Sequence, residues 1–145
     1  MRKSSIIVVA MILCIISIPI CMGAYTYYFE FIFPMLWVHN NIEYCVVAGN
    51  IWRTAPEILQ SGKGSCKDMT ILLMYNMKDK DHIEMLITQE NGKAQTHAAV
   101  LVRRTLVLDP STGKATKKYL YMEGRKEIRS IPYSRVNAYV HKSVL

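Results

Sequence analysis

The sequence predicts an α+β domain in which helices come first along the chain and antiparallel strands follow. Helix signals with capping residues cover residues 54–77. Short apolar runs bounded by turn residues come next, at 82–88, 97–102 and 105–109. A chain of 145 residues has room for one such domain and no more.

The first part of the chain has the composition of a membrane segment. Residues 4–29 carry no charge, and two positive residues, Arg2 and Lys3, precede them. About 20 apolar residues suffice to cross a bilayer. The leading positive charges favour an orientation with the N-terminus inside, which sends the following residues across the inner membrane.

These features divide the chain into two parts. We expect a signal anchor or signal peptide in residues 1–24 and a periplasmic domain in residues 25–145. An uncleaved anchor, forming an N-terminal membrane helix, is preferred, because Cys21-Met22-Gly23 is a poor cleavage site. If the segment is cleaved, the domain is released into the periplasm.

Two helices are expected in the middle of the chain, after an aromatic-rich stretch that is helical up to Pro34. The first begins at Thr54, where Glu57 three residues later completes a capping box, and it ends at Gly62. The second runs from Cys66 to about Met77. Beyond the three apolar runs, we expect two more strands, at 119–122 and 137–141.

Three residues form a candidate thiol site. Cys66 follows a glycine-rich loop and opens a helix, where unpaired backbone N–H groups and the helix dipole favour a thiolate. His97 opens one apolar run, and Asp109 closes the next. Each is an ordinary core or surface residue when taken alone. Together, in this order, they have the layout of a thiol hydrolase.

The pairing of the last two runs decides whether His97 and Asp109 can meet. A two-residue turn at Arg103 and Arg104 would place their side chains on opposite faces of the sheet. An odd-numbered loop or a bulge puts them on one face. With residues 102–104 as the loop, His97 would lie directly opposite Asp109. We therefore predict an odd loop or a bulge.

The other cysteines and the charges point to no further chemistry. Cys14 and Cys21 lie in the apolar segment, and Cys45 fits a core position. We expect no disulfide between Cys45 and Cys66, and the spacing contains no zinc motif. The net charge of +7 suggests a solvated basic face near an anionic membrane, and we expect no nucleic acid as partner because no reader module is present. The basic residues concerned are Lys114, Lys117, Lys118, Arg125, Lys126 and Arg129.

Five short blocks resemble the bacterial transglutaminase-like cysteine proteinases. They are Asn41-Ile42-Glu43-Tyr44, Trp52-Arg53-Thr54-Ala55-Pro56-Glu57-Ile58-Leu59, Gly62-Lys63-Gly64-Ser65-Cys66-Lys67-Asp68, His97-Ala98-Ala99-Val100-Leu101-Val102 and Leu106-Val107-Leu108-Asp109. The likeness covers about residues 40–113. It implies a papain-like, transglutaminase-like core, with the nucleophile Cys at a helix N-terminus packed on an antiparallel sheet. It also implies a Cys66, His97, Asp109 triad in a periplasmic enzyme that acts on protein or peptide.

The residues beside the thiol depart from the family pattern. The family typically has Asp-Cys-Glu-Asp, and in its calcium-dependent members the acidic neighbours help to bind the ion. This chain has Ser65 and Lys67 there. Calcium takes several oxygen ligands, usually carboxylates, so we expect no calcium and no other cofactor. Lys67 would instead help to hold the thiolate.

Three functions remain open at this point. The preferred one is a membrane-tethered cysteine peptidase or amidase that works through an acyl-enzyme. Asn50 and Trp52 are candidates for a second oxyanion donor beside the Cys66 N–H, and Trp52 fits a core aromatic equally well. The alternatives are a transglutaminase-type acyl transferase with the same triad and an inactive binding module of the same fold.

Overall fold

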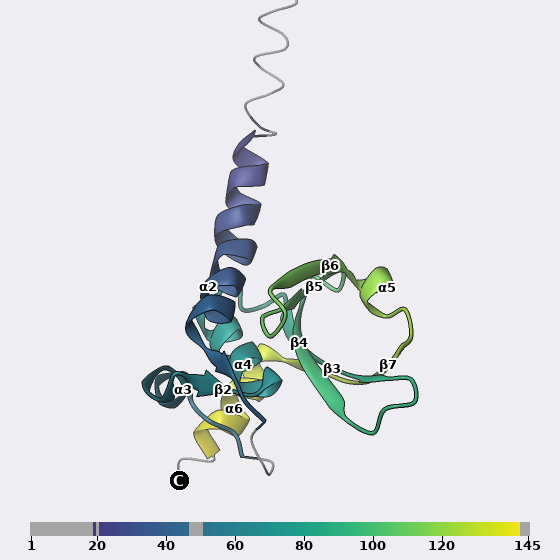
Figure 1. Ribbon diagram of the computed structural model, residues 1–145. Coiled ribbons are helices and arrows are strands. Elements are labelled where there is room, and N and C mark those ends of the chain that lie inside the picture. Colours follow the sequence, from purple (N-terminus) through teal and green to yellow (C-terminus); the bar gives the residue numbers. More distant parts are fainter. Residues whose placement is uncertain (1–18, 20, 47–50, 143–145) are drawn as a thin grey trace, which may run out of the picture.

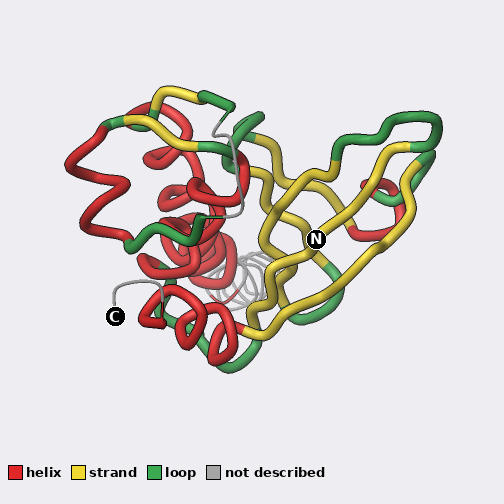
Figure 2. The backbone as a smooth tube through the Cα atoms, turned by 90° about the horizontal axis from the view of Figure 1, so that it is seen from below, coloured by secondary structure: helices red, strands yellow, loops and turns green. Residues whose placement is uncertain are grey.

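The computed structural model describes residues 19, 21–46 and 51–142. Helices gather on one side of the molecule and the strands of a curled sheet on the other (Figure 2). The helices are α2 (Phe33–Asn41), α3 (Ala55–Ser61), α4 (Cys66–Asn76), α5 (Lys118–Tyr121) and α6 (Tyr133–Lys142). The mixed architecture with an antiparallel sheet confirms the predicted fold class.

The main sheet has five antiparallel strands in the order β6-β5-β4-β3-β7. Their bounds are β3 (Ile83–Glu90), β4 (Thr96–Val102), β5 (Leu106–Asp109), β6 (Lys114–Lys117) and β7 (Arg125–Pro132). Figure 1 shows the sheet curling until α5 closes the gap between its two outer strands. Two very short strands, β1 (Glu43–Tyr44) and β2 (Lys63–Gly64), pair in parallel beside α3.

The two faces of the sheet bury different side chains. Alternate residues such as Met85, Val100 and Leu108 join the main core, which they share with α4. The residues between them, such as Leu86 and Ala99, form a smaller core inside the curl. Every residue of α4 from Asp68 to Met74 is buried, so this helix is the centre of the domain.

The N-terminal helix is longer than expected. Residues 21–27 are helical, a π-helical turn η1 (Tyr28–Ile32) follows, and α2 continues without a break past Pro34. The expected end at Pro34 is wrong: the chain stays helical through the proline, which directly follows a π-helical turn in which the Phe33 N–H bonds the Tyr28 carbonyl. Most of the expected membrane helix lies outside the described residues. In the part that is described, no helix is both long and apolar enough to cross a bilayer.

Two expected strands are helices. The segment 119–122 falls largely in α5, and 137–141 lies inside α6. In α6 the buried residues Val136 and Val140 are four apart, which is the spacing of one helical face. By contrast, the expected starts and ends of α3 and α4 are confirmed: α3 has the Thr54–Glu57 capping box and ends at Gly62 in the left-handed conformation.

Candidate functional site

Cys66 is the first residue of α4, as the sequence predicted. Ser65 is the N-cap: its hydroxyl accepts from the Asp68 N–H, and Asp68 in turn accepts from the Ser65 N–H. This capping box satisfies helix N–H groups that would otherwise lack partners. The thiol is therefore held at a well-defined helix start, where the dipole favours a negative charge.

A partly buried ion pair holds this helix start in place. The Arg53 Nη2 atom lies 2.9 Å from Asp68 Oδ2 and also donates to the Lys63 carbonyl at 2.6 Å. Gly64 allows the close approach, since a Cβ there would lie 3.0 Å from the Asp68 Cβ. Arg53 and Gly64 stand in two of the sequence blocks, but their roles depend on tertiary contacts that the sequence does not show.

The hairpin of β4 and β5 brings His97 and Asp109 together. Val102 pairs with Leu106, so the loop has three residues, and the predicted odd loop is confirmed. The predicted direct opposition is wrong: continued along the ladder, this register places Asp109 across from Ala99, two residues from His97. Side chains in this diagonal relation can still meet. The His97 Nε2 and Asp109 Oδ2 atoms are 2.9 Å apart.

The carboxyl of Asp109 is held on its other side by its own turn. Its Oδ1 accepts from the Ser111 N–H at 3.1 Å and from the Ser111 hydroxyl at 2.7 Å. His39 of α2 packs on the same turn, with Nδ1 3.1 Å from the Pro110 carbonyl. A Cβ on Gly113 would lie 2.9 Å from the His39 ring. His39 thus packs against the loop that carries Asp109 and helps to hold it in place.

The Cys66 thiol interacts with His97 and Ala98, which lie in β4 beyond the end of its pairing with β5. The ladder between these strands ends at Val100 and Leu108. Interactions with the His97 ring, the Ala98 backbone and the Lys67 backbone lower the pKa of the Cys66 thiol. Because Asp109 occupies Nε2 of the ring, Nδ1 is the nitrogen left to face the sulfur. The three predicted residues are therefore in one continuous chain of contacts.

The three site residues shift one another's pKa values towards the charged forms. Burial acts to raise the pKa of the Cys66 thiol, but the His97 hydrogen bond and charge, with two backbone hydrogen bonds, bring it below its ordinary value. Burial acts to lower the pKa of His97, but the contacts with Asp109 and Cys66 raise it to about 9. Burial also acts to raise the pKa of Asp109, and the hydrogen bond and charge of His97 more than offset it. These shifts favour a thiolate beside an imidazolium.

Lys67 acts on the sulfur mainly through its backbone. Its ammonium group lies 5.0 Å from the centre of the Trp52 ring, in a cation–π contact. The same ring lies 5.3 Å from that of Tyr139 and packs against the main core. Trp52 thus has the packing of a core aromatic. The other oxyanion candidate, Asn50, lies outside the described residues.

Tyr44 is a residue of the site that the sequence reasoning missed. It lines a polar cavity of about 250 Å³ together with His97 and Asp109. Burial raises the pKa of Tyr44, and the charges of Cys66, Cys45 and Asp109 add to the effect. The only signal in the sequence was its place in the first block of the family resemblance. Cys45, next to it, is a free thiol in this structure, as is Cys66.

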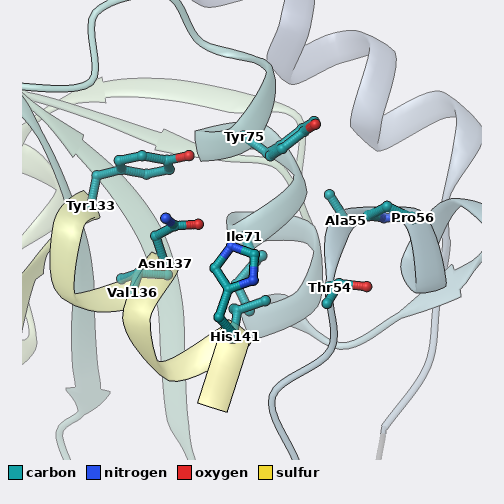
Figure 3. Close-up of a pocket in the computed structure, with 10 residues that line it drawn as sticks. Thr54, Ala55, Pro56, Ile71, Tyr75, Tyr133, Val136, Asn137 and His141 are labelled. Atoms are coloured by element: carbon teal, nitrogen blue, oxygen red, sulfur yellow. The ribbon is translucent and has the colours of Figure 1, made fainter. Parts of the chain in front are cut away.

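A second pocket, of about 220 Å³, lies away from the thiol, between α3, α4 and α6 (Figure 3). Its floor is apolar, with Ile71 and Val136, and the Tyr75 and Tyr133 rings stand on one side. His141 projects into it from α6. None of the predicted site residues lines it, so it belongs to the packing of α6 on α4.

Comparison with known proteins supports the fold. No protein-family model matches the chain, and no curated protein matches its sequence. A structure of LapG from Legionella pneumophila matches with a TM-score of 0.60 and 16% identity, over 77% of each chain. Calcium-bound LapG matches with a TM-score of 0.54 and EGTA-treated LapG with 0.56, both at 18% identity. These two matches cover 68% of this chain and 64% and 62% of LapG. At this identity the likeness shows the fold alone: the chain has a fold similar to that of LapG.

Proposed function

We propose that this chain is a cysteine peptidase or amidase with Cys66 as nucleophile, His97 as acid and base, and Asp109 as the group that orients the ring. One observation carries the proposal: the His97 ring lies 2.9 Å from the Asp109 carboxyl, and the interaction of the same ring with Cys66 lowers the pKa of the thiol. The family that the sequence resembles and the LapG-like fold support it.

The reaction would pass through a thioester. The Cys66 thiolate attacks the carbonyl carbon of an amide, and the C=O electron pair moves to oxygen. The His97 imidazolium gives its proton to the leaving nitrogen as the C–N bond breaks. His97 then takes a proton from water, which attacks the thioester and releases the acid and the thiolate. Asp109 stays ionised and holds the ring orientation.

The oxyanion formed in each step needs donors. The Cys66 N–H belongs to the first helical residue, so it has no partner within the helix and can donate to the oxyanion. Asn50 and Trp52 remain proposals for the second donor. The Tyr44 hydroxyl, in the cavity beside His97, is a third candidate.

A thiol-reactive probe tests the proposal. At neutral pH, iodoacetamide should label Cys66 much faster than Cys45, and His97→Ala should abolish the difference. His82→Ala is the matched control, because His82 also pairs with an aspartate, Asp79, but lies on the exposed surface. Equal labelling of Cys66 and Cys45 in the unchanged protein would favour the inactive binding module instead. Product analysis with and without an added amine then separates hydrolysis from acyl transfer.

We further propose that the domain is tethered to the inner membrane and acts in the periplasm. The support is the uncharged stretch 4–29 behind Arg2 and Lys3. Cell fractionation, with protease added to intact spheroplasts, tests it. If the domain is tethered, the protein should be in the membrane fraction, and protease added outside the spheroplasts should digest it. Protein found in the soluble fraction would contradict the tether.

Whether this chain binds calcium is a separate question, because one of the similar LapG structures is calcium-bound. The residues described here do not fit it: they contain no group of three or more His, Cys, Asp or Glu that could hold a metal. Asp68 Oδ2 already accepts from Arg53 and Ser65. Asp68 Oδ1 has no hydrogen-bond partner, but a single oxygen is far from the six to eight that calcium takes. We therefore assign no catalytic step to calcium.

A further inference from the structure

A largely apolar cavity whose lining includes three basic residues and two tyrosines lies between the N-terminal helix and the curled sheet. It has a volume of about 750 Å³. Tyr27 of the helix forms one side, and Arg104, Lys117 and Lys118 come from the sheet and from α5. None of the described residues that line it is acidic.

The basic groups of this cavity are only partly neutralised. Arg104 has a loose contact with Glu84, with 3.5 Å between nitrogen and oxygen, and its side chain is 85% exposed. Lys118 pairs with Glu127 at 2.8 Å. Lys117 is exposed, and the described part of the chain offers it no ion pair. A negatively charged ligand would therefore meet at least one uncompensated cation there.

The position of the cavity along the chain indicates what that ligand is. A membrane span needs about 20 residues, so one that starts where the uncharged stretch does, at Ser4, ends near Gly23. At about 1.5 Å per helical residue, Tyr27 then lies about 6 Å beyond the hydrocarbon. The headgroup layer is roughly 5–7 Å thick on each side. The cavity therefore stands at the level of the lipid headgroups.

The exposed surface around it agrees with this level. Tyr25 on the helix and Tyr119 beside the cavity are each 65% exposed. Aromatic rings of this kind are enriched at membrane interfaces. Figure 1 shows β6 and α5 at the end of the sheet towards which the N-terminal helix extends.

We propose that this cavity binds the headgroup of an anionic phospholipid, so that the sheet rests on the membrane surface and the thiol site is held at a fixed height. The proposal rests on the membrane tether of the proposed function, and it is independent of the catalytic role of Cys66. The phosphodiester of the lipid would lie between Arg104 and Lys117, with Tyr27 and Tyr119 against the glycerol region.

The test uses the full chain in lipid nanodiscs. One set contains phosphatidylcholine alone, and the other contains about 30 mol % phosphatidylglycerol. Acetylation of Lys117 by an amine-reactive reagent is measured by mass spectrometry relative to Lys93, an exposed lysine in the turn between β3 and β4, at the opposite end of β4 from Arg104. We expect Lys117 to react about fivefold more slowly with the anionic lipid, and the protection to disappear in about 0.5 M NaCl.

Two neighbouring arginines give a matched pair of variants. Arg103 and Arg104 share the turn between β4 and β5, both have positive φ, and each contacts an acidic residue. Only Arg104 lines the cavity. Arg104→Gln should reduce the protection of Lys117, and Arg103→Gln should leave it unchanged. Equal Lys117 reactivity in the two lipids, or equal effects of the two variants, would overturn the proposal.

The outcomes also separate this proposal from the others. Failure of the chain to enter the nanodiscs would remove the tether and this surface together. Insertion without protection of Lys117 removes the surface alone. Iodoacetamide labelling of Cys66, measured in the same samples, reports on the thiol site independently.

Discussion

At the scale of single residues, the two nitrogens of His97 define the site. Asp109 lies on Nε2, which leaves Nδ1 to the sulfur and fixes the orientation of the ring. A carboxylate in this place does two things: it holds the ring, and its charge favours the protonated imidazole. An amide can do only the first.

Asp109→Asn separates these two roles. The variant keeps a hydrogen-bonding side chain but loses the charge that raises the pKa of His97. We expect the rate of Cys66 alkylation at neutral pH to fall and hydrolysis to fall by about two to four orders of magnitude. Asp79→Asn, which alters the exposed pair with His82, should change neither rate. Unchanged Cys66 reactivity in Asp109→Asn would show that the carboxyl has no part in the site.

The raised pKa of His97 also predicts a pH profile. The ion pair requires a deprotonated Cys66 and a protonated His97, so it exists above the lowered thiol pKa and below about 9. Hydrolysis should therefore decline as the pH rises through about 9, whereas alkylation of Cys66 should not, because the thiolate persists. The stability from His97 protonation has the same sign: it is complete below about 6.5, the ordinary histidine pKa, and is lost as the pH rises towards 9. Urea unfolding across this range measures it.

At the scale of secondary-structure elements, two capping boxes offer a controlled comparison. Thr54 caps α3 and Ser65 caps α4, each with an acidic residue at the third helical position. Replacing either by alanine should lower the free energy of unfolding by about 1 kcal/mol. Only Ser65→Ala should also slow the alkylation of Cys66, because only α4 carries the thiol. Equal alkylation rates in the two variants would mean that the helix start does not tune the sulfur.

The hairpin shows what a sequence pattern can and cannot determine. Alternation of inward and outward side chains fixes the parity of a strand pair, and the parity argument correctly required an odd loop. A shift of two residues leaves the parity unchanged, so the pattern cannot tell Asp109 opposite His97 from Asp109 opposite Ala99. The loop that forms has Arg103 and Arg104 at φ of 47° and 58°. A positive φ is not predicted for arginine, because glycine or asparagine usually adopts this conformation.

The elements after residue 113 were the least predictable. Of the residues of β7, only Ile131 is buried, so the strand has no alternating apolar pattern and its charges suggested a solvated face. The structure divides the basic residues of this region between β6 and α5 on one edge of the sheet and β7 on the other. Within the site, Cys66, His97 and Asp109 have recognisable side chains. The Ala98 and Lys67 backbone donors have no sequence signature, because their use depends on where β5 leaves β4.

At the scale of the whole molecule, the site lies on the boundary between the helices and the sheet. The thiol comes from the buried central helix, and its two partners come from adjacent strands of the sheet. The α4 helix packs on one face of that sheet through the main core. The geometry of the site therefore depends on the packing of the two layers, and a ligand that bridged them would stabilise the fold as a whole.

The effect of calcium on stability is the last prediction. We expect neither EGTA nor excess calcium to change the midpoint of thermal unfolding or the alkylation rate of Cys66, because Arg53 and Ser65 already occupy Asp68 Oδ2. A bound ion at 100 times its dissociation constant would add about 2.7 kcal/mol, which thermal unfolding detects readily. The double variant Ser65→Asp, Lys67→Glu is the positive comparison, since aspartate is an equally good N-cap and both changes add carboxylate oxygens beside Asp68. Calcium should stabilise this variant alone. Stabilisation of the unchanged chain would show that the cation contacts at the start of α4 do not exclude the ion.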